Sequence, residues 1–422
     1  MLQAGDVETA FLNAGIEETI YIRPPRDHSD FQRDFLWQLR KSLYGLRTAP
    51  KAWHGHVKSL LEEHGYKCSR IDGGVFYNHK TDSMLVIHVD DIIVSGDAKD
   101  VDNLFQSLSS SLILKLSAQL RSSSKDDEVI EFLGRTISRQ GPVFLYHGDA
   151  SLVDLSLSEL NMVECKSAPT PGVVKGEDES EVLDDETSAA YRRHTGRLMY
   201  LAQDRLDAQF SVKQLARSMS TPTQADFTAV KRALRYLAGR RVLTYRFDVS
   251  MADYAQPCVY VDSDWAGCRV TRRSTSGGIL CLGAACVGSW SKTQSTVALS
   301  SAEAELGAIC TGTVEAQYLK SLLVEQGIRV DRVVVHSDSQ AALDGLVRGG
   351  VGRLKHIGIK SLFLQELVKN KTVSLRKIKG DVNVADILTK HVPEKVLSTL
   401  LALLPVSFDE KKTEDQNLGS DV

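Results

Sequence analysis

The most informative pattern in this chain is Leu85-Val-Ile-His-Val-Asp-Asp-Ile-Ile-Val94. Two adjacent aspartates, Asp90 and Asp91, stand between apolar residues on both sides. An unpaired carboxylate is costly inside a buried strand, so we expect the pair at a turn. The pattern predicts a β-hairpin whose tip presents both carboxylates to a divalent cation such as Mg²⁺, which prefers oxygen ligands. A turn with two solvated acids is the alternative, although turns more often contain Gly, Asn or Pro.

The composition bounds the class of protein. A chain of 422 residues is long enough for two or three domains, and 42% hydrophobic with 25% charged residues is typical of a globular protein. The net charge is only −3, so a surface that binds nucleic acid has to be local. The seven cysteines contain no Cys-x-x-Cys pair, which predicts reduced thiols in an intracellular compartment. The sequence shows no signal peptide and no apolar run of roughly 18 residues that would span a membrane.

The segments around the hairpin predict a mixed first domain. Asp6–Asn13 is expected to be a strand that runs into a helix, and this start in mid-motif predicts that an N-terminal piece of the domain is missing. An amphipathic helix is expected within Leu39–Gly65. Val101–Leu116 has helical periodicity, and Val129–Ser138 with Val143–Tyr146 predicts a second hairpin.

A change of composition marks the middle of the chain. The segment Ala168–Ser188 begins with Pro-Thr-Pro-Gly after its alanine and is rich in acids, which predicts a linker. Tyr191–Arg241 then reads as a helical block. Its Lys231, Arg232 and Arg235 lie near one another at helical spacing, which fits a stripe that contacts phosphates or, equally, a solvated helix face.

The remaining sequence predicts a mixed α/β sheet of about five strands, because three hairpin-connected strands are followed by alternating helices and strands. The expected elements are strands at 258–265, 277–282 and 286–291, a helix at 301–325, a strand at 332–337, a helix at 339–347, a basic helix at 353–370, a strand at 373–379 and a helix at 382–391. The polar tail Ser407–Val422 is expected to be disordered.

Four acids occupy telling places in these elements: Asp262 in the first strand, Glu305 near the start of the long helix, Asp338 at a strand end and Asp386 on the last helix. Each has an ordinary alternative, since an acid can cap a helix or favour its N-terminus. The sequence Ser300-Ser-Ala-Glu303 indeed resembles a capping box. If all four converge on one sheet edge, their repulsion requires cations. Such an arrangement suits two-metal hydrolysis of a phosphodiester.

Short motifs throughout the last domain carry a resemblance to a known family. They are Tyr260-Val-Asp-Ser-Asp-Trp-Ala-Gly267, Arg273-Ser-Thr-Ser-Gly-Gly278, Ser289-Trp-Ser-Lys292, Thr296-Val-Ala-Leu-Ser-Ser-Ala-Glu-Ala-Glu305, Ser337-Asp-Ser-Gln340, Lys355-His-Ile357 and Ala385-Asp-Ile-Leu-Thr-Lys390. Together they resemble the ribonuclease H domain of copia-type LTR retrotransposon Pol polyproteins. In that family the metal-binding acids fall on Asp262, Glu305, Asp338 and Asp386.

The upstream segments resemble the same polyproteins. Asp6–Asn13 is similar to polymerase motif A, Lys41-Ser-Leu-Tyr-Gly-Leu46 to motif B, and His88-Val-Asp-Asp91 to the catalytic hairpin. Further matches are Phe132-Leu-Gly134 near the primer grip, with Gly196-Arg-Leu-Met-Tyr-Leu201 and Lys231-Arg-Ala-Leu-Arg-Tyr-Leu237 in the connecting region. The resemblance covers residues 1–395.

The resemblance implies a reverse transcriptase joined to a ribonuclease H. Asp6, Asp90 and Asp91 would hold two Mg²⁺ ions at the polymerase site, and the ribonuclease acids would hold two more, with Mn²⁺ as a substitute. The implied partners are an RNA template, a DNA primer, dNTPs and an RNA–DNA hybrid, with no membrane. The implied substrate-binding residues are Phe11, Tyr44, Gly45, Lys231, Arg235, Lys355 and His356. Phe11 falls at the aromatic gate against the ribose 2′-hydroxyl, and a core aromatic is its alternative role.

The chain also departs from the family pattern. Because the chain begins at motif A, we expect the fingers segment to be missing; in addition, His88 replaces an aromatic residue, Ile71-Asp-Gly-Gly74 lacks a proline, and Leu206 replaces another. We therefore expect impaired polymerase activity. The alternatives are a catalytically inactive or domesticated nucleic-acid-binding remnant, and a nuclease whose palm only binds hybrid. An intracellular location, cytoplasmic or nuclear, is expected.

These interpretations combine into one expected architecture of α/β and α+β domains. The expected parts are a truncated reverse-transcriptase palm and thumb-like region at 1–167, an acidic linker at 168–188, a helical connection at 189–255, a ribonuclease H-like domain with a mixed five-stranded sheet at 256–395, and a disordered tail at 407–422.

Overall fold

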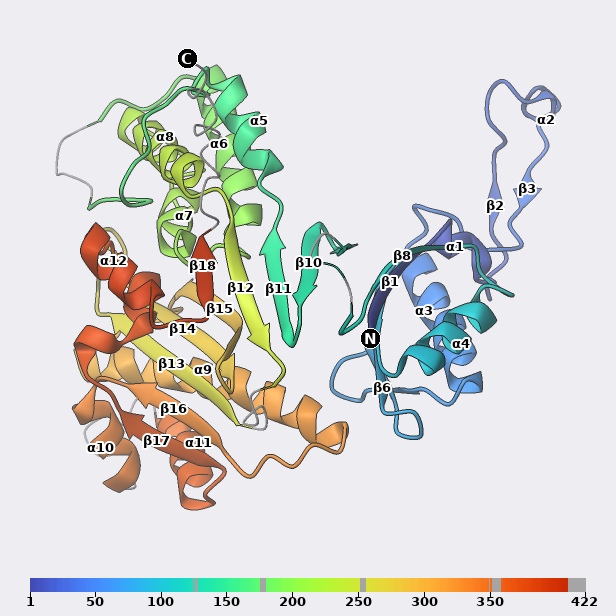
Figure 1. Cartoon of the computed structure of the whole chain (residues 1–422). Coiled ribbons are helices and arrows are strands. Elements are labelled where there is room, and N and C mark those ends of the chain that lie inside the picture. Colours follow the sequence, from blue (N-terminus) through green and yellow to red (C-terminus); the bar gives the residue numbers. More distant parts are fainter. Residues whose placement is uncertain are drawn as a thin grey trace, which may run out of the picture. The chain divides into compact units, whose positions relative to one another are not determined.

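A computed structural model describes residues 1–123, 125, 128–174, 180–250, 256–348, 350 and 358–408 (Figure 1). The chain divides into two units, Met1–Pro142 and Val143–Val422, and each is described by itself. Within the described residues, no helix is both long and apolar enough to cross a membrane.

The first unit is built on a six-stranded sheet with the strand order β4-β5-β6-β7-β1-β8. The strands are β1 (Leu2–Val7), β4 (Lys67–Cys68), β5 (Val75–Asn78), β6 (Ser83–His88), β7 (Asp91–Ser95) and β8 (Leu114–Leu120). Alternate residues of β6 are buried, as expected for a strand with one face on the core. The amphipathic helices α3 (Ala49–Glu63) and α4 (Ala98–Leu108) contribute buried residues to that core.

Shorter elements complete this unit. They are α1 (Ala10–Asn13), β2 (Tyr21–Ile22), α2 (Ser29–Gln32), β3 (Trp37–Gln38), β9 (Val129–Phe132) and β10 (Arg135–Gln140). The hairpin predicted around the paired aspartates is confirmed, because β6 and β7 pair antiparallel with His88 opposite Asp91. The strand and helix predicted for Asp6–Asn13 are present as β1 and α1.

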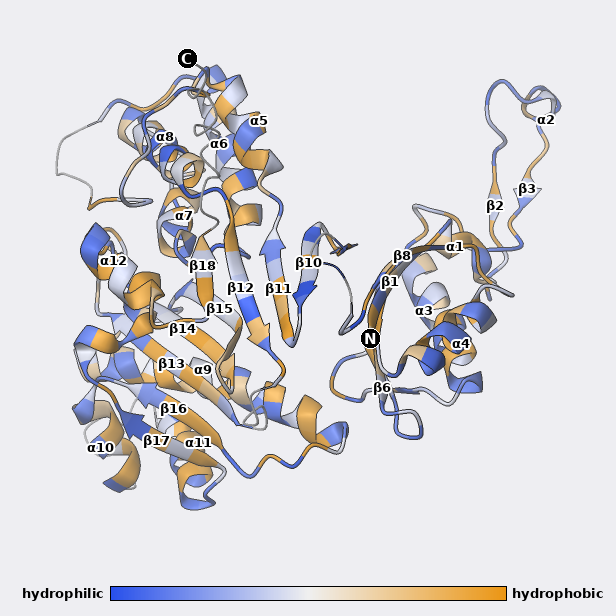
Figure 2. Cartoon of the chain, in the orientation of Figure 1, coloured by the Kyte–Doolittle hydropathy of each residue, from blue (hydrophilic) through white to orange (hydrophobic). Residues whose placement is uncertain are grey.

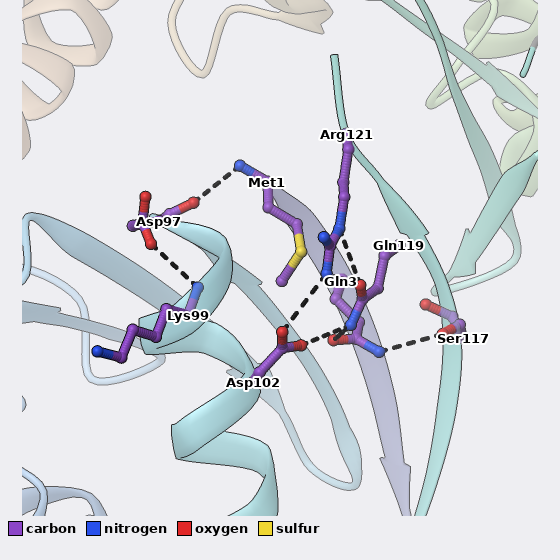
Figure 3. A network of polar contacts seen from close by, with 9 residues as sticks. Met1, Gln3, Asp97, Lys99, Asp102, Ser117, Gln119 and Arg121 are labelled. Atoms are coloured by element: carbon purple, nitrogen blue, oxygen red, sulfur yellow. Dashed lines mark hydrogen bonds and ion pairs between the residues drawn. The ribbon is translucent and has the colours of Figure 1, made fainter. Parts of the chain in front are cut away.

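A polar network fixes β1, the strand that carries Asp6 (Figure 3). The Gln3 side chain, 4% exposed, donates to the Ser117 carbonyl of β8 at 3.2 Å and accepts from Gln119 at 3.1 Å. Gln119 also donates to Asp102 of α4 at 2.7 Å, and Arg121 lies 3.4 Å from the same carboxylate. The network ties β1 to its neighbouring strand and to α4.

Two predictions for this unit are wrong in detail. The helix expected at Val101–Leu116 ends at Leu108 because a serine run follows. Ser109 and Ser110 donate their hydroxyls to carbonyl oxygens of the last turn, at 2.8 and 2.7 Å, and such bonds compete with helix propagation. The strand expected at Val129–Ser138 is instead two strands, β9 and β10, which pair across a turn at 133–134.

The second unit contains the predicted mixed five-stranded sheet, in the order β15-β14-β13-β16-β17. Its strands are β13 (Pro257–Asp264), β14 (Thr275–Leu282), β15 (Ala285–Thr293), β16 (Val333–Ser337) and β17 (Val373–Lys377). The first three pair antiparallel, whereas β16 is parallel to both β13 and β17. Helices α9 (Ser301–Glu325), α10 (Gln340–Arg348) and α11 (Gly358–Lys369) share a core with this sheet. Figure 2 shows apolar positions concentrated along β13 and β14.

A second core joins a helical region to the same sheet. The helices are α5 (Ser151–Glu159), α6 (Asp185–Leu201), α7 (Gln209–Ala216), α8 (Gln224–Gly239) and α12 (Glu394–Leu401), accompanied by strands β11 (Val143–Gly148), β12 (Leu243–Asp248) and β18 (Val406–Phe408). Residues from these helices pack in one cluster with Ile279 and Cys281 of β14. The helical block predicted for Tyr191–Arg241 is thus present as three helices.

The helix predicted at 382–391 is wrong. The segment forms two short 3₁₀ helices, η2 (Gly380–Val382) and η3 (Val384–Leu388), because Asn383 between them bonds to β13. The expected linker is described only outside 175–179, and its first residue, Ala168, is 1% exposed. The first residues of the expected basic helix and the tail beyond Phe408 lie outside the described residues. Strands β12 and β18 and helix α12 were not predicted.

Candidate metal centres

The parallel pairing of β13 and β16 brings the first two acids of the second unit together. Tyr260 on β13 is the register partner of His336 on β16, and the two rings stack at a centroid distance of 4.6 Å. Side chains two residues apart on a strand share a face. Asp262 and Asp338 therefore follow on the same face as that pair, Asp338 one residue beyond the end of β16. Ser339, rather than Asp338, caps α10 by accepting from the Ala342 amide at 3.4 Å.

The third acid arrives on η3, which is anchored by Asn383. This residue is completely buried; its amide nitrogen donates to the Val261 carbonyl at 3.1 Å and its oxygen accepts from the Ala385 amide at 3.2 Å. A bond to a strand 122 residues away replaces the regular helix that periodicity predicted. Gly277 allows the contact, since a Cβ there would lie 2.8 Å from atoms of both Leu388 and Thr389.

Asp262, Asp338 and Asp386 form a tight group, which we call the acid cluster. One ligand oxygen from each lies within 4.8 Å of the others, and no other group of three acids, histidines or cysteines within the described ranges meets this spacing. Burial and the Asp262 carboxylate raise the pKa of Asp338, and the same two causes raise the pKa of Asp386 to about 6. Like charges held this close in a partly buried site favour a bound cation.

Glu305 adjoins the acid cluster rather than belonging to it. Ser300 caps α9 by accepting from the Glu303 amide at 3.2 Å, which confirms the predicted N-cap, whereas the Glu303 side chain accepts from the Leu299 amide at 2.8 Å. One Glu305 oxygen accepts from the Ser263 amide and hydroxyl at 3.3 and 2.9 Å. Burial, then Asp262, raises the pKa of Glu305 to about 8. The predicted convergence of four acids thus takes the form of three in one group with the fourth beside Asp262.

Two further side chains contact the acid cluster. The Lys390 ammonium lies 2.9 Å from an Asp386 oxygen and 3.8 Å from an Asp262 oxygen. The Thr389 hydroxyl donates to that same Asp262 oxygen. Sequence reasoning missed these two residues as well as Ser263 and Asn383. The spacing of Lys390, four residues after Asp386, was the available signal for an ion pair.

The residues of the acid cluster fit a divalent cation. Their donor set is entirely carboxylate oxygen, which hard cations prefer. One oxygen of Asp386 and one of Glu305 are buried and lack a hydrogen-bond partner among the described residues. Buried carboxylate oxygens are normally satisfied, so these two are available as ligands.

In the first unit, antiparallel strand pairing places the third acid, Asp6, beside the hairpin that carries the other two. Asp6 of β1 is the register partner of Asp91 on β7, and the Val7 amide donates to the Asp90 carbonyl at 2.9 Å. Burial, then Asp90 and Asp6, raises the pKa of Asp91. We call Asp6, Asp90 and Asp91 the hairpin acids. Their ligand atoms do not form a described group as tight as the acid cluster.

The turn that presents the hairpin acids is strained. Val89 has a φ of 58°, a left-handed conformation that is rare for a β-branched residue. Its carbonyl accepts a hydrogen bond of 2.5 Å from the indole of Trp53, a buried residue of α3. Such strain persists where the surroundings enforce it and is common at functional sites. No sequence pattern predicted the hydrogen bond between Trp53 and Val89.

The aromatic residues predicted to contact substrate lie side by side. The rings of Phe11 and Tyr44 have a centroid distance of 4.8 Å and an interplanar angle of 53°. Tyr44 is 52% exposed, whereas Phe11 is partly buried against the core. Gly45 adopts a φ of 94°, which favours glycine. Phe11 therefore combines a packing contact with a position beside an exposed ring.

The predicted basic stripe makes structural contacts. Arg235 donates to the Lys166 carbonyl at 2.7 Å, and Arg232 donates to the Thr170 hydroxyl at 2.9 Å, which holds 166–170 against α8. The Lys231 ammonium lies 4.9 Å from the centroid of the Phe227 ring. Lys355 and His356 lie outside the described residues.

The family model and the relatives found by comparison with known proteins agree with one another. Residues 1–171 match a family model described as reverse transcriptase (RNA-dependent DNA polymerase). The chain is similar to the retrovirus-related Pol polyprotein from transposon RE1 of Arabidopsis thaliana, with 31% identity over 95% of this chain and 27% of that protein. The corresponding polyprotein from transposon TNT 1-94 of Nicotiana tabacum is 30% identical over 92% of this chain and 29% of that protein. The chain thus spans little more than a quarter of the length of these relatives.

Two further matches cover parts of the chain. An uncharacterised mitochondrial protein of Arabidopsis thaliana is 33% identical over 55% of this chain and 92% of that protein. Among solved structures, RNase H1 from the archaeon Halobacterium salinarum matches 32% of this chain and 94% of its own, with 18% identity and a TM-score of 0.24.

Proposed function

This chain belongs to the copia-type retrotransposon Pol polyproteins, with a reverse transcriptase domain followed by a ribonuclease H-like fold, and we propose that its acid cluster cleaves the RNA strand of an RNA–DNA hybrid. The observation that carries this proposal is the spacing of Asp262, Asp338 and Asp386, whose ligand oxygens lie within 4.8 Å of one another. Glu305 supplies a fourth carboxylate beside them.

The residues of the site would have two kinds of role, metal binding and the orientation of the metal ligands. Asp262, Asp338 and Asp386 would hold Mg²⁺ or Mn²⁺, and Glu305 would complete the ligand set. Bound there, the cations would activate water for attack on the phosphodiester and stabilise the leaving oxygen. Ser263 orients Glu305 through two hydrogen bonds, and Thr389 orients Asp262. With a pKa of about 8, Glu305 would carry a proton at neutral pH without a cation and would have to lose it to act as a ligand.

Cleavage of a labelled hybrid tests this function. The full chain with Mg²⁺ should cut the RNA strand and leave the DNA strand intact. Asp262→Asn should lower the rate by at least about 100-fold, since loss of a ligand should exceed the loss seen for its supporting residues. Asp344→Asn on α10 is the matched control, because this acid is not a member of the acid cluster and pairs with Arg348. An intact RNA strand after incubation of a folded, hybrid-binding chain would contradict the proposal.

The hairpin acids are the second candidate site, and the Asp6–Asp91 register favours it. We propose that they hold two Mg²⁺ ions for RNA-directed DNA synthesis from a DNA primer, an RNA template and dNTPs. Phe11 and Tyr44 would lie along the nucleotide. Because impaired polymerase activity is expected, extension of a primed RNA template by the full chain should be weak, and Asp90→Asn should abolish what remains. Extension that survives this substitution would exclude the hairpin acids.

The expected division of the chain stands as part of this proposal: palm at 1–167, linker at 168–188, connection at 189–255 and ribonuclease H-like part at 256–395. An intracellular site of action is also proposed, and it agrees with seven cysteines that are all free. Loss of both activities with retained hybrid binding would favour the alternative of an inactive nucleic-acid-binding remnant.

A further inference from the structure

Lys390 occupies an unusual position for a lysine beside a candidate metal centre. Its ammonium contacts two members of the acid cluster at once, 2.9 Å from Asp386 and 3.8 Å from Asp262. The two carboxylates are poorly exposed, with 16% and 5% of their side chains accessible, whereas the Lys390 side chain is 49% accessible. The charge therefore reaches the cluster from its solvent side.

The charge balance of the cluster makes this contact significant. Three carboxylates lie within 4.8 Å of one another, and Glu305 adds a fourth beside them. The other described lysine at the site, Lys377, contacts the main-chain carbonyl of Asp338 rather than a carboxylate. An ammonium is a compact point charge with three donors, so Lys390 can satisfy two carboxylates as a cation would.

We propose that Lys390 is an internal counter-ion of the acid cluster that competes with a divalent cation for Asp386 and Asp262. The ammonium stabilises the cation-free cluster and leaves these oxygens when a divalent cation binds. Its half-exposed, flexible side chain can turn toward solvent without unpacking the core. The inference rests on the proposed metal centre.

The proposed competition predicts how the affinity for a divalent cation and the stability of the cation-free protein change when Lys390 is replaced. Removing the ammonium frees two carboxylate oxygens, so the affinity for a divalent cation should rise. A unit charge about 4 Å away contributes about 1 kcal/mol even when fully screened by water, which corresponds to at least about a fivefold change in affinity. The cation-free protein should become less stable, because the carboxylates then repel one another without compensation.

The test compares Mn²⁺ binding and thermal stability in the full chain at pH 7.5 without nucleic acid. Lys390→Met should bind Mn²⁺ at least about fivefold more tightly than the wild type and melt at a lower temperature in EDTA. Lys390→Arg should retain both wild-type values, because it keeps the charge. Lys395→Met, a charge removal on the exposed side of α12, should change neither.

The outcomes separate this inference from the proposed function. Wild-type binding of Mn²⁺ with equal or weaker binding by Lys390→Met would overturn the competition and leave the metal centre intact. An unchanged melting temperature of Lys390→Met in EDTA would overturn the counter-ion role. Absence of Mn²⁺ binding in both chains would overturn the metal centre and the competition together.

Discussion

The hairpin acids and the acid cluster bring three carboxylates together in different ways. The hairpin acids come from neighbouring strands, with Asp90 and Asp91 adjacent in the chain and Asp6 paired with Asp91. The acid cluster draws on β13, the end of β16 and η3, which together span more than a hundred residues of sequence. The hairpin acids lie at a turn and on the strand paired beside it, whereas the acid cluster combines a strand, a strand end and a short 3₁₀ helix.

The difference is electrostatic as well as topological. Burial and like charges raise the pKa of Asp386 to about 6 and that of Glu305 to about 8. In the hairpin, burial raises the pKa of Asp91. The cluster is therefore the centre whose stability should depend most strongly on a cation.

The largest expected effect is the difference in hybrid cleavage between a substitution in the acid cluster and one in the hairpin acids. Asp338→Asn should lower hybrid cleavage by at least about 100-fold because it removes a cluster ligand. Asp90→Asn, an equally conservative change at the hairpin, should leave cleavage within twofold of wild type, a bound we set at roughly 0.4 kcal/mol. Rates of RNA cleavage by both full-length variants check this. A large loss in Asp90→Asn would show that the centres are not independent.

Loss of the η3 anchor should have the next largest effect. Asn383→Ala leaves the Val261 carbonyl without its buried partner and frees the segment that carries Asp386. We expect cleavage to fall roughly 10–100-fold and stability to fall by about 1–3 kcal/mol. Titration with Mn²⁺ and chemical denaturation measure the two losses. Asn370→Ala, on the exposed turn after α11, is the control.

The stability of the cation-free protein should depend on pH because of Glu305, which lies beside the acid cluster. The pKa of Glu305 is higher in the folded protein, about 8, than its ordinary value of 4.5. Between these values the folded state binds more protons, so stability without cations should fall as the pH rises from 5 to 8. The expected loss is on the order of 1 kcal/mol or more.

Glu305→Gln should flatten this pH profile, and Mg²⁺ should restore the wild-type stability at pH 8. Melting temperatures in EDTA and in Mg²⁺ across the pH range provide the measurement. A wild-type profile that rises from pH 5 to 8 in EDTA would show that Glu305 is not held in its protonated form.

The anchor of the hairpin turn gives the smallest expected effect. Trp53→Phe keeps the aromatic packing of α3 but removes the hydrogen bond to the Val89 carbonyl. The expected loss is about 0.5–1.5 kcal/mol in the stability of the first unit, with hybrid cleavage unchanged. Hydrogen exchange at β6 and β7 would locate the loss. Equal exchange in both proteins would mean that the strained turn holds without Trp53.

Much of the cluster was predictable because strand patterns fix where side chains point. Asp262 and Asp338 follow from a strand centre and a strand end, and Asp90 with Asp91 follows from a hairpin tip. Asp386 was predicted on a helix, since periodicity cannot reveal that Asn383 bonds to a strand 122 residues away. Lys390 and Ser263 were missed because their roles arise only after the acids have been brought together.

Anomalous diffraction from a crystal of the full chain soaked in Mn²⁺ tests most directly whether the acid cluster binds a metal ion. We expect an anomalous peak bound by carboxylate oxygens of Asp262, Asp338 and Asp386, with the Lys390 ammonium displaced from Asp386. A well-ordered site with no peak, and with Lys390 still on Asp386, would contradict it.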